Sequence, residues 1–159
     1  MRILLVDDER DFCNTTAAVL KRDGHEVVCA YSEAEGSELL CQRGREFDVA
    51  VLDMYMEEDD SGLRLVRLVD HLKLPTIPIV LTGRGTDSNK VESKKAGAYR
   101  YVRKGSSDQN KALVRAVNEA QRFQMGRAAA GRAAEHVKAA DQTATRLERV
   151  FREGDNPAE

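Results

Sequence analysis

Residues 48–56 read DVAVLDMYM, where a short continuous apolar run ends in Asp53. An uninterrupted apolar run of this length is typical of a parallel strand that is buried on both faces. The first residues of the chain have the same form, because ILLV at positions 3–6 leads directly into Asp7 and Asp8. Two such strands predict a buried parallel sheet with acidic side chains gathered at one edge.

Outward from this stretch, strand-like and helix-like segments alternate along the chain. We expect strands at 3–6, 25–31, 48–53, 78–82 and 99–103, with helices at 12–22, from 33, from 61, at 87–96 and after 107. Ser32 is placed to cap the second helix, and Ser106 or Ser107 to cap the last. This alternation predicts an α/β fold, a doubly wound five-stranded parallel sheet with helices on both faces and right-handed crossovers.

Reactive polar groups stand at the carboxyl ends of four expected strands. Asp7 and Asp8 follow the first, Asp53 ends the third, Thr82 ends the fourth and Lys104 follows the fifth. These ends meet at one edge of a parallel sheet, so the side chains should converge there. Crowded carboxylates need a cation between them, and Mg²⁺ prefers oxygen ligands while keeping waters that a phosphate can replace. An aspartate facing Mg²⁺ and a lysine is one route to an aspartyl phosphate.

Four fragments in order carry a family resemblance: LLVDDE at 4–9, DVAVLDMYM at 48–56, PIVLTG at 78–83 and GAYRYVRK at 97–104. With them, residues 1–122 resemble the response-regulator receiver domain of two-component signal transduction. The resemblance implies a flavodoxin-like strand order 2-1-3-4-5 and a phosphorylation-switched receiver that acts through protein–protein contacts. It also implies Mg²⁺ as cofactor and a sensor histidine kinase or phosphotransfer protein as partner.

The resemblance assigns roles to individual residues. Asp53 would accept the phosphoryl group, and Thr82 and Lys104 would complete the catalytic set. The implied Mg²⁺ ligands are Asp7, Asp8, Asp53 and Tyr55. Of these, Asp7 would act through water and Tyr55 through its backbone carbonyl. The only enzymatic activity expected is self-phosphorylation from a phosphodonor and autodephosphorylation.

Further implied roles concern switching and lifetime. Thr82 and Tyr101 would move on phosphorylation and change the surface of the fourth helix, fifth strand and fifth helix. Tyr55 and Arg84 stand two residues beyond the acceptor and the threonine, positions that flank the path of the attacking water in this family. Neither is a natural water-orienting amide or carboxylate, so we expect a long-lived phosphorylated state.

The sequence departs from the family pattern in two loops. Glu57 follows Met56 where the family usually has proline, and Gly62 lies one residue farther from Asp53 than is usual. Gly105 follows Lys104, again in place of a proline.

A helical tail is expected at residues 123–152, followed by a disordered end at 153–159. The tail is rich in alanine and carries an apolar stripe at three- and four-residue steps, including Phe123, Val137 and Phe151. A stripe this long needs a partner surface, which leaves three alternatives. The helix pairs with a second copy as a homodimer, folds back near Gly126, or binds another protein.

Composition excludes several classes of function. The net charge of −2 and a nearly neutral tail give no basis for direct DNA binding, and no apolar run is long enough for a membrane span. The cysteines Cys13, Cys29 and Cys41 form no CxxC motif, which is typical of reduced thiols in a cytoplasmic protein.

Two rival functions remain open at this stage. A haloacid-dehalogenase-like phosphatase also uses an aspartate nucleophile and Mg²⁺, but it would need a second aspartate at the position of Tyr55. A pseudo-receiver that serves as a non-phosphorylated scaffold would not need the full set of acceptor, metal and lysine residues.

Overall fold

The computed structural model describes residues 1–83 and 87–154 of the 159-residue chain. One sheet contains five parallel strands: β1 (Arg2–Val6), β2 (Glu26–Ala30), β3 (Val49–Asp53), β4 (Ile77–Thr82) and β5 (Arg100–Arg103). Their order is β2-β1-β3-β4-β5, which confirms the predicted fold class and the order implied by the family resemblance. In the register, Val6 lies opposite Leu52, so β1 and β3 end side by side.

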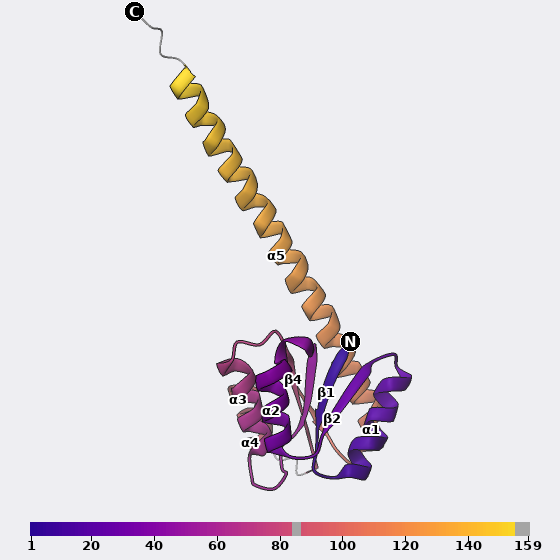
Figure 1. The fold of residues 1–159 in the computed structure, drawn as a ribbon. Coiled ribbons are helices and arrows are strands. Elements are labelled where there is room, and N and C mark those ends of the chain that lie inside the picture. The colour runs from indigo at the N-terminus through magenta and orange to yellow at the C-terminus, as the bar shows by residue number, and fades with distance from the viewer. Residues whose placement is uncertain (84–86, 155–159) are drawn as a thin grey trace, which may run out of the picture. The chain divides into compact units, whose positions relative to one another are not determined.

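The helices form one layer on each face of the sheet (Figure 1). They are α1 (Arg10–Arg22), α2 (Glu33–Arg43), α3 (Ser61–His71), α4 (Asp87–Ala96) and α5 (Gln109–Gly154), with a 3-10 turn at Gly44–Glu46. Helix α1 and the first turns of α5 cover one face, and α2, α3 and α4 cover the other.

Alternation along each strand divides the core into two clusters. Leu5 of β1 packs under α1 and α5, whereas Leu4 packs under α2 and α3. Both side chains are fully buried, as is every residue of β3 to within a few per cent. Each such aliphatic side chain contributes about 1.5–3 kcal/mol by leaving water. The apolar runs seen in the sequence are therefore the central strands, and they fix where the polar strand ends emerge.

Helix starts follow local chemistry, with one correction. The Ser32 hydroxyl accepts a hydrogen bond from the backbone N–H of Glu35 at 3.0 Å, so the predicted cap of α2 is confirmed. The predicted cap of the last helix is wrong, because α5 begins at Gln109 and neither Ser106 nor Ser107 precedes it directly. The residue directly before α5 is Asp108, and Gly105 turns the chain with a φ of 76° and donates its N–H to the Gln109 side chain at 2.7 Å.

The chain divides into two compact units, Met1–Gln121 and Arg122–Glu159. Within the second unit, α5 continues through Gly126 to Gly154, so the described helix does not take the fold-back near Gly126 that was one of the three alternatives. Glycine inside a helix costs only about 1 kcal/mol relative to alanine, which surrounding alanines readily offset. The helix includes Glu153 and Gly154 of the end predicted to be disordered, and residues 155–159 lie outside the described part.

Apolar side chains of the tail are exposed. Phe123, Met125 and Val137 are 46%, 65% and 70% exposed. The later stripe residues Ala144, Leu147 and Phe151 have side chains outside the described set. Among the described helices, none combines the length and apolar character needed to cross a bilayer.

Candidate functional site

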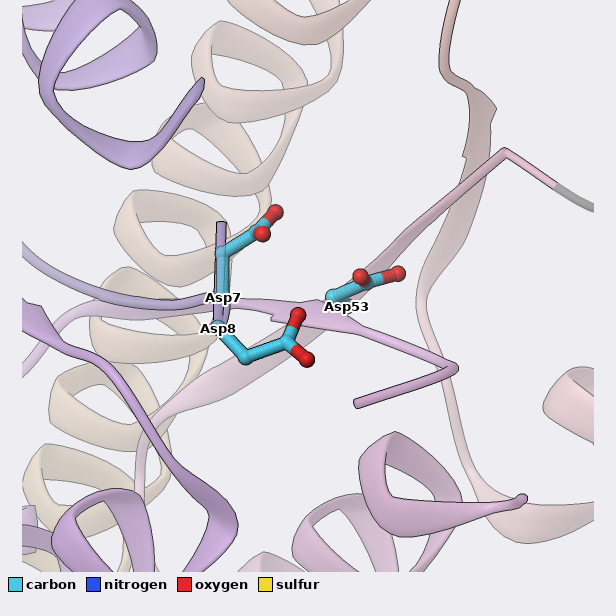
Figure 2. A group of neighbouring side chains, drawn as sticks. All are labelled: Asp7, Asp8 and Asp53. Atoms are coloured by element: carbon cyan, nitrogen blue, oxygen red, sulfur yellow. The ribbon is translucent and has the colours of Figure 1, made fainter. Parts of the chain in front are cut away.

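Three carboxylates gather where β1 and β3 end. Asp7 and Asp8 follow β1 directly, and Asp53 is the last residue of β3. Each offers one oxygen within 4.8 Å of the oxygens of the other two, and Figure 2 shows the three side chains grouped at this edge of the sheet. Asp7 and Asp53 are buried, whereas Asp8 is exposed. The predicted convergence of these aspartates is therefore present in the structure.

Lys104 forms ion pairs with both buried carboxylates. Its Nζ lies 2.7 Å from Oδ2 of Asp53 and 2.6 Å from Oδ2 of Asp7, with an oxygen of Glu9 at 3.8 Å. The lysine is held in place from two sides, since its side chain is only 8% exposed and its ammonium lies 4.3 Å from the centre of the Phe12 ring. A buried ammonium between two buried carboxylates fixes the direction in which each carboxylate points.

The electrostatics of these groups are dominated by burial. Loss of solvent raises the pKa of Asp53 to about 6, although the hydrogen bond and charge of Lys104 oppose the shift. Burial also raises the pKa of Asp7 above its usual value. For Lys104, burial alone would lower the pKa, but its hydrogen bonds to Asp53 and Asp7 outweigh that effect and raise it. Near pH 7 the site thus holds a mostly ionised Asp53 against the cationic Lys104.

The raised pKa of Asp53 predicts that the stability of the fold depends on pH, and that Asp53→Asn removes this dependence. The pKa of Asp53 is 3.8 in an unfolded chain and about 6 in the folded protein, so the folded protein holds this proton more tightly. Stability from this group is fully present below pH 4 and is lost as the pH rises through about 6. Without metal, Asp53→Asn should match the parent chain near pH 4 and exceed its unfolding free energy by up to about 3 kcal/mol at pH 7.5.

Urea unfolding in EDTA at these two pH values measures the difference. Asp70→Asn, which removes an exposed carboxylate on α3, serves as the control and should give no such trend. A stability gain of equal size at both pH values would contradict the assigned cause.

Gly62 makes the closest backbone approach at the site. A Cβ atom at this position would lie 2.2 Å from the carbonyl oxygen of Asp53 and 2.7 Å from Cα of Met54. The glycine N–H also donates to the carbonyl of Met54 at 3.2 Å. The start of α3 therefore rests directly on the backbone of the residue that carries the central carboxylate.

The longer loop between β3 and α3 is held by an arginine. Arg64 contacts both carboxylate oxygens of Glu33 on α2, at 2.5 and 2.7 Å, and one oxygen of Glu58 at 3.1 Å. Asp60, with a left-handed φ of 70°, is the residue before α3. Aspartate tolerates this conformation better than most residues, so one such turn can accommodate the additional residue.

Tyr55 connects the loop that follows β3 to α4. Its backbone N–H lies 3.4 Å from Oδ1 of Asp53, and its hydroxyl accepts a hydrogen bond from the amide of Asn89 on α4 at 2.6 Å. The ring is held at the edge of the open pocket around the carboxylates. That pocket is lined by Asp8, Glu9, Asp53, Tyr55, Met56, Glu57, Glu58, Asp59, Gly83 and Lys104.

The remaining predicted residues differ in how closely they approach the site. Thr82 ends β4 and is fully buried, and its carbonyl accepts the backbone N–H of Lys104 at 2.8 Å. Tyr101 on β5 is half-buried, and its hydroxyl has no hydrogen-bond partner among the described residues. Arg84 lies outside the described residues.

Sequence reasoning did not identify four neighbours of the site: Glu9, Phe12, Arg64 and Asn89. Glu9 had a usable signal, because it lies two residues after Asp7 at a strand end. The other three reach the site from helices, and no spacing in the sequence relates them to a strand end.

A doubly wound sheet whose strand ends bring together aspartates and a lysine is the arrangement expected of the receiver class of signalling domains. The sequence model of the response regulator receiver domain matches residues 3–118. The chain belongs to this family, the receiver domains of two-component response regulators, and nothing in the comparisons supports the phosphatase or scaffold alternatives.

Curated relatives are longer than this chain. A putative NtrX-like response regulator of Rickettsia bellii is 30% identical over 104 residues, covering 64% of this chain and 21% of the relative. The transcriptional regulatory protein ZraR of Salmonella typhimurium is 36% identical over 102 residues, which cover 63% of this chain and 22% of ZraR. The chain thus matches about a fifth of the length of each of these two relatives.

Solved structures have the same fold. A CheY-like receiver domain protein from Methanospirillum hungatei is 27% identical with a TM-score of 0.71, covering 79% of this chain and 97% of that one. A receiver domain protein from Clostridium thermocellum is 30% identical with a TM-score of 0.68, and the match covers 78% of this chain and 97% of that one.

Proposed function

We propose that Asp53 is the phosphoacceptor of this receiver. The observation that carries the proposal is the bridge from Lys104 to Asp53 and Asp7, with Asp8 beside it. In the transfer, the bond between phosphorus and the donor breaks while a carboxylate oxygen of Asp53 bonds to phosphorus. A pKa of about 6 leaves Asp53 mostly ionised at neutral pH, as a nucleophile must be.

The donor set fits a hard divalent cation. Asp7, Asp8 and Asp53 provide oxygens only, and Lys104 neutralises just part of their charge. We propose that they hold Mg²⁺ together with the backbone carbonyl of Tyr55, Asp7 acting through water. When bound, Mg²⁺ would offset the negative charge on the phosphoryl oxygens.

Lys104 and Thr82 serve the transferred group in this proposal. Lys104 would move from Oδ2 of Asp53 to a phosphoryl oxygen, a displacement that its flexible four-carbon stem allows. Thr82 would donate its hydroxyl to a second oxygen, and Tyr101 would respond to the movement of Thr82. The buried hydroxyl of Tyr101, with no partner among the described residues, supports its role as a mobile group.

The test is exposure of the chain to Mg²⁺ and acetyl phosphate, followed by intact mass. A receiver accumulates one phosphoryl adduct and forms none when EDTA removes the metal. A phosphatase would release phosphate continuously without a lasting adduct, and a scaffold would do neither.

The partners in this proposal are a sensor histidine kinase or phosphotransfer protein upstream and a protein target downstream, in the cytoplasm. The net charge of −2 supports protein–protein output over direct DNA binding.

The exposed Phe123, Met125 and Val137 support a further contact, a homodimer through the tail helix. Because alanine dominates the tail, little area is buried per residue and the affinity should be modest.

Truncation after Phe123 should convert a concentration-dependent dimer into a monomer that still accepts phosphate. The first compact unit ends at Gln121, so this cut leaves its core residues in place. Sedimentation of both chains over a wide concentration range gives the association state. If the full chain remains monomeric at high concentration, binding of the tail to a different protein becomes the better account.

Tyr55→Asn and Arg84→Glu should each shorten the lifetime of the phosphorylated state. In-line attack needs a positioned water, and a small amide or carboxylate positions it better than the Tyr55 ring, which its hydroxyl bond to Asn89 holds at the pocket edge. We expect decay in excess Mg²⁺ to accelerate by roughly tenfold.

Tyr55→Phe is the matched control, because it removes the Asn89 bond but keeps the ring, and it should change the decay less. Unchanged or slower decay in both Tyr55→Asn and Arg84→Glu would show that these side chains do not limit access of water.

A further inference from the structure

Two cysteines outside the aspartate site pack into the same core cluster under α1. Cys29 on β2 is the register partner of Leu5 on β1, and both side chains belong to the core cluster on the α1 face. Cys13 on α1 enters the same cluster from above, and its Sγ lies 3.9 Å from the carbonyl oxygen of Leu5. Because neighbouring strands are about 4.8 Å apart, Cys29 lies beside the backbone of Leu5. The sulfur of Cys13 contacts that same residue.

The two thiols differ in exposure. Cys13 is fully buried and Cys29 is half-buried on the edge strand. Of these two thiols, an oxidant in solvent can therefore reach only Cys29. Hydrogen bonding with Cys13 lowers the pKa of Cys29 to about 7, and the charge of Lys21 and the hydroxyl of Tyr31 act in the same direction. The same hydrogen bond, with burial, raises the pKa of Cys13. A reachable thiolate therefore lies beside a protonated, sheltered thiol.

We propose that Cys13 and Cys29 are an oxidisable pair that a hydroperoxide converts into a disulfide within the domain. In the first step, Cys29 sulfur attacks a peroxide oxygen and the O–O bond breaks. Cys29 becomes a sulfenic acid, and the leaving oxygen takes a proton as water or alcohol. In the second step, Cys13 sulfur attacks Cys29 sulfur and the S–O bond breaks. The hydroxyl leaves with the Cys13 proton as water. Two thiols are oxidised by two electrons and one peroxide is reduced.

This pair lies close to the aspartate site. Phe12, adjacent to Cys13 on α1, contacts Lys104 with its ring, and the charges of Asp7 and Lys104 both act on the Cys13 thiol. A disulfide from α1 to β2 would fix this end of α1 and should alter the rate of phosphorylation at least twofold. This last consequence rests on the proposed function, whereas formation of the disulfide does not.

The test treats the reduced full chain with a small excess of hydrogen peroxide and measures intact mass without reductant. Cys29 and Cys41 share one tryptic peptide, because no lysine or arginine separates residues 23 and 42. The assay therefore uses Cys41→Ser, which removes the exposed third thiol. We expect this chain to lose two hydrogen atoms and to give one linked peptide containing Cys13 and Cys29. Adding Cys29→Ser should abolish the link.

A second readout does not depend on disulfide geometry. In the Cys41→Ser background, alkylation of Cys29 should show a midpoint near pH 7, below the ordinary thiol value of about 8.5. Adding Cys13→Ala should move the midpoint upward and slow alkylation at pH 7 by roughly threefold, because a smaller thiolate fraction is partly offset by greater nucleophilicity. Two free thiols after peroxide, a sulfinic acid at Cys29 without a link, or disulfides only between chains would each overturn the proposal.

Discussion

Asp53→Asn is expected to abolish the phosphoryl adduct that the chain forms with Mg²⁺ and acetyl phosphate. Asparagine is nearly isosteric with aspartate, so it can keep the contacts of Oδ1 with the Tyr55 N–H, but its amide is not a nucleophile for phosphorus. The loss of adduct should exceed a hundredfold by intact mass. Far-UV circular dichroism should remain unchanged, because the strand around residue 53 is packed by apolar neighbours.

The control is again Asp70→Asn, which changes an exposed carboxylate on α3 and should phosphorylate normally. An undiminished mass shift in Asp53→Asn would place the phosphoryl group elsewhere. In that case Asp8 would be the first candidate, because it is the exposed member of the cluster.

Gly62→Ala should be the most damaging single-methyl substitution among the glycines of the described residues. Its Cβ would stand 2.2 Å from the Asp53 carbonyl oxygen and 2.7 Å from Met54 Cα, and both obstacles are backbone atoms that cannot rotate away. Overpacking of this kind costs about 1–3 kcal/mol or more. We expect the unfolding free energy to fall by about 3 kcal/mol, with slower phosphorylation because Asp53 is displaced.

Gly126→Ala provides the matched control, since a Cβ there meets no atom within 4 Å and alanine favours the helix. It should leave the stability of the first unit and its phosphorylation rate unchanged. Equal stability of Gly62→Ala and the parent chain in urea would mean that α3 can shift away from β3.

The fold could be predicted from the sequence because its signals are local. Apolar runs such as 49–52 and turn residues such as Gly24 mark strand and helix ends without any knowledge of the neighbours. The strand order could be predicted only from the family resemblance, because no local sequence signal indicates which strands pair. The start of α5 was missed because two nearby serines offered an obvious cap, whereas the long-range bond from the Gly105 N–H to the Gln109 side chain has no signal in the sequence.

The site could be predicted to the extent that it stands on strand ends. Asp7, Asp53 and Lys104 follow from topology alone, because the ends of parallel strands share one edge. Phe12, Arg64 and Asn89 could not be predicted in the same way. Each contacts the site through the rotation and tilt of a helix, which depend on packing across the whole domain.

The bridge made by Lys104 also bears on when the metal is needed. Two buried carboxylates already have their counter-ion in the polypeptide, at 2.6 and 2.7 Å, so the domain can fold before any divalent ion arrives. Three carboxylates and one ammonium leave a formal charge of −2, the complement of one divalent cation. In the proposed function, Mg²⁺ therefore binds a domain that is already folded, and its binding would add to the stability of that folded state.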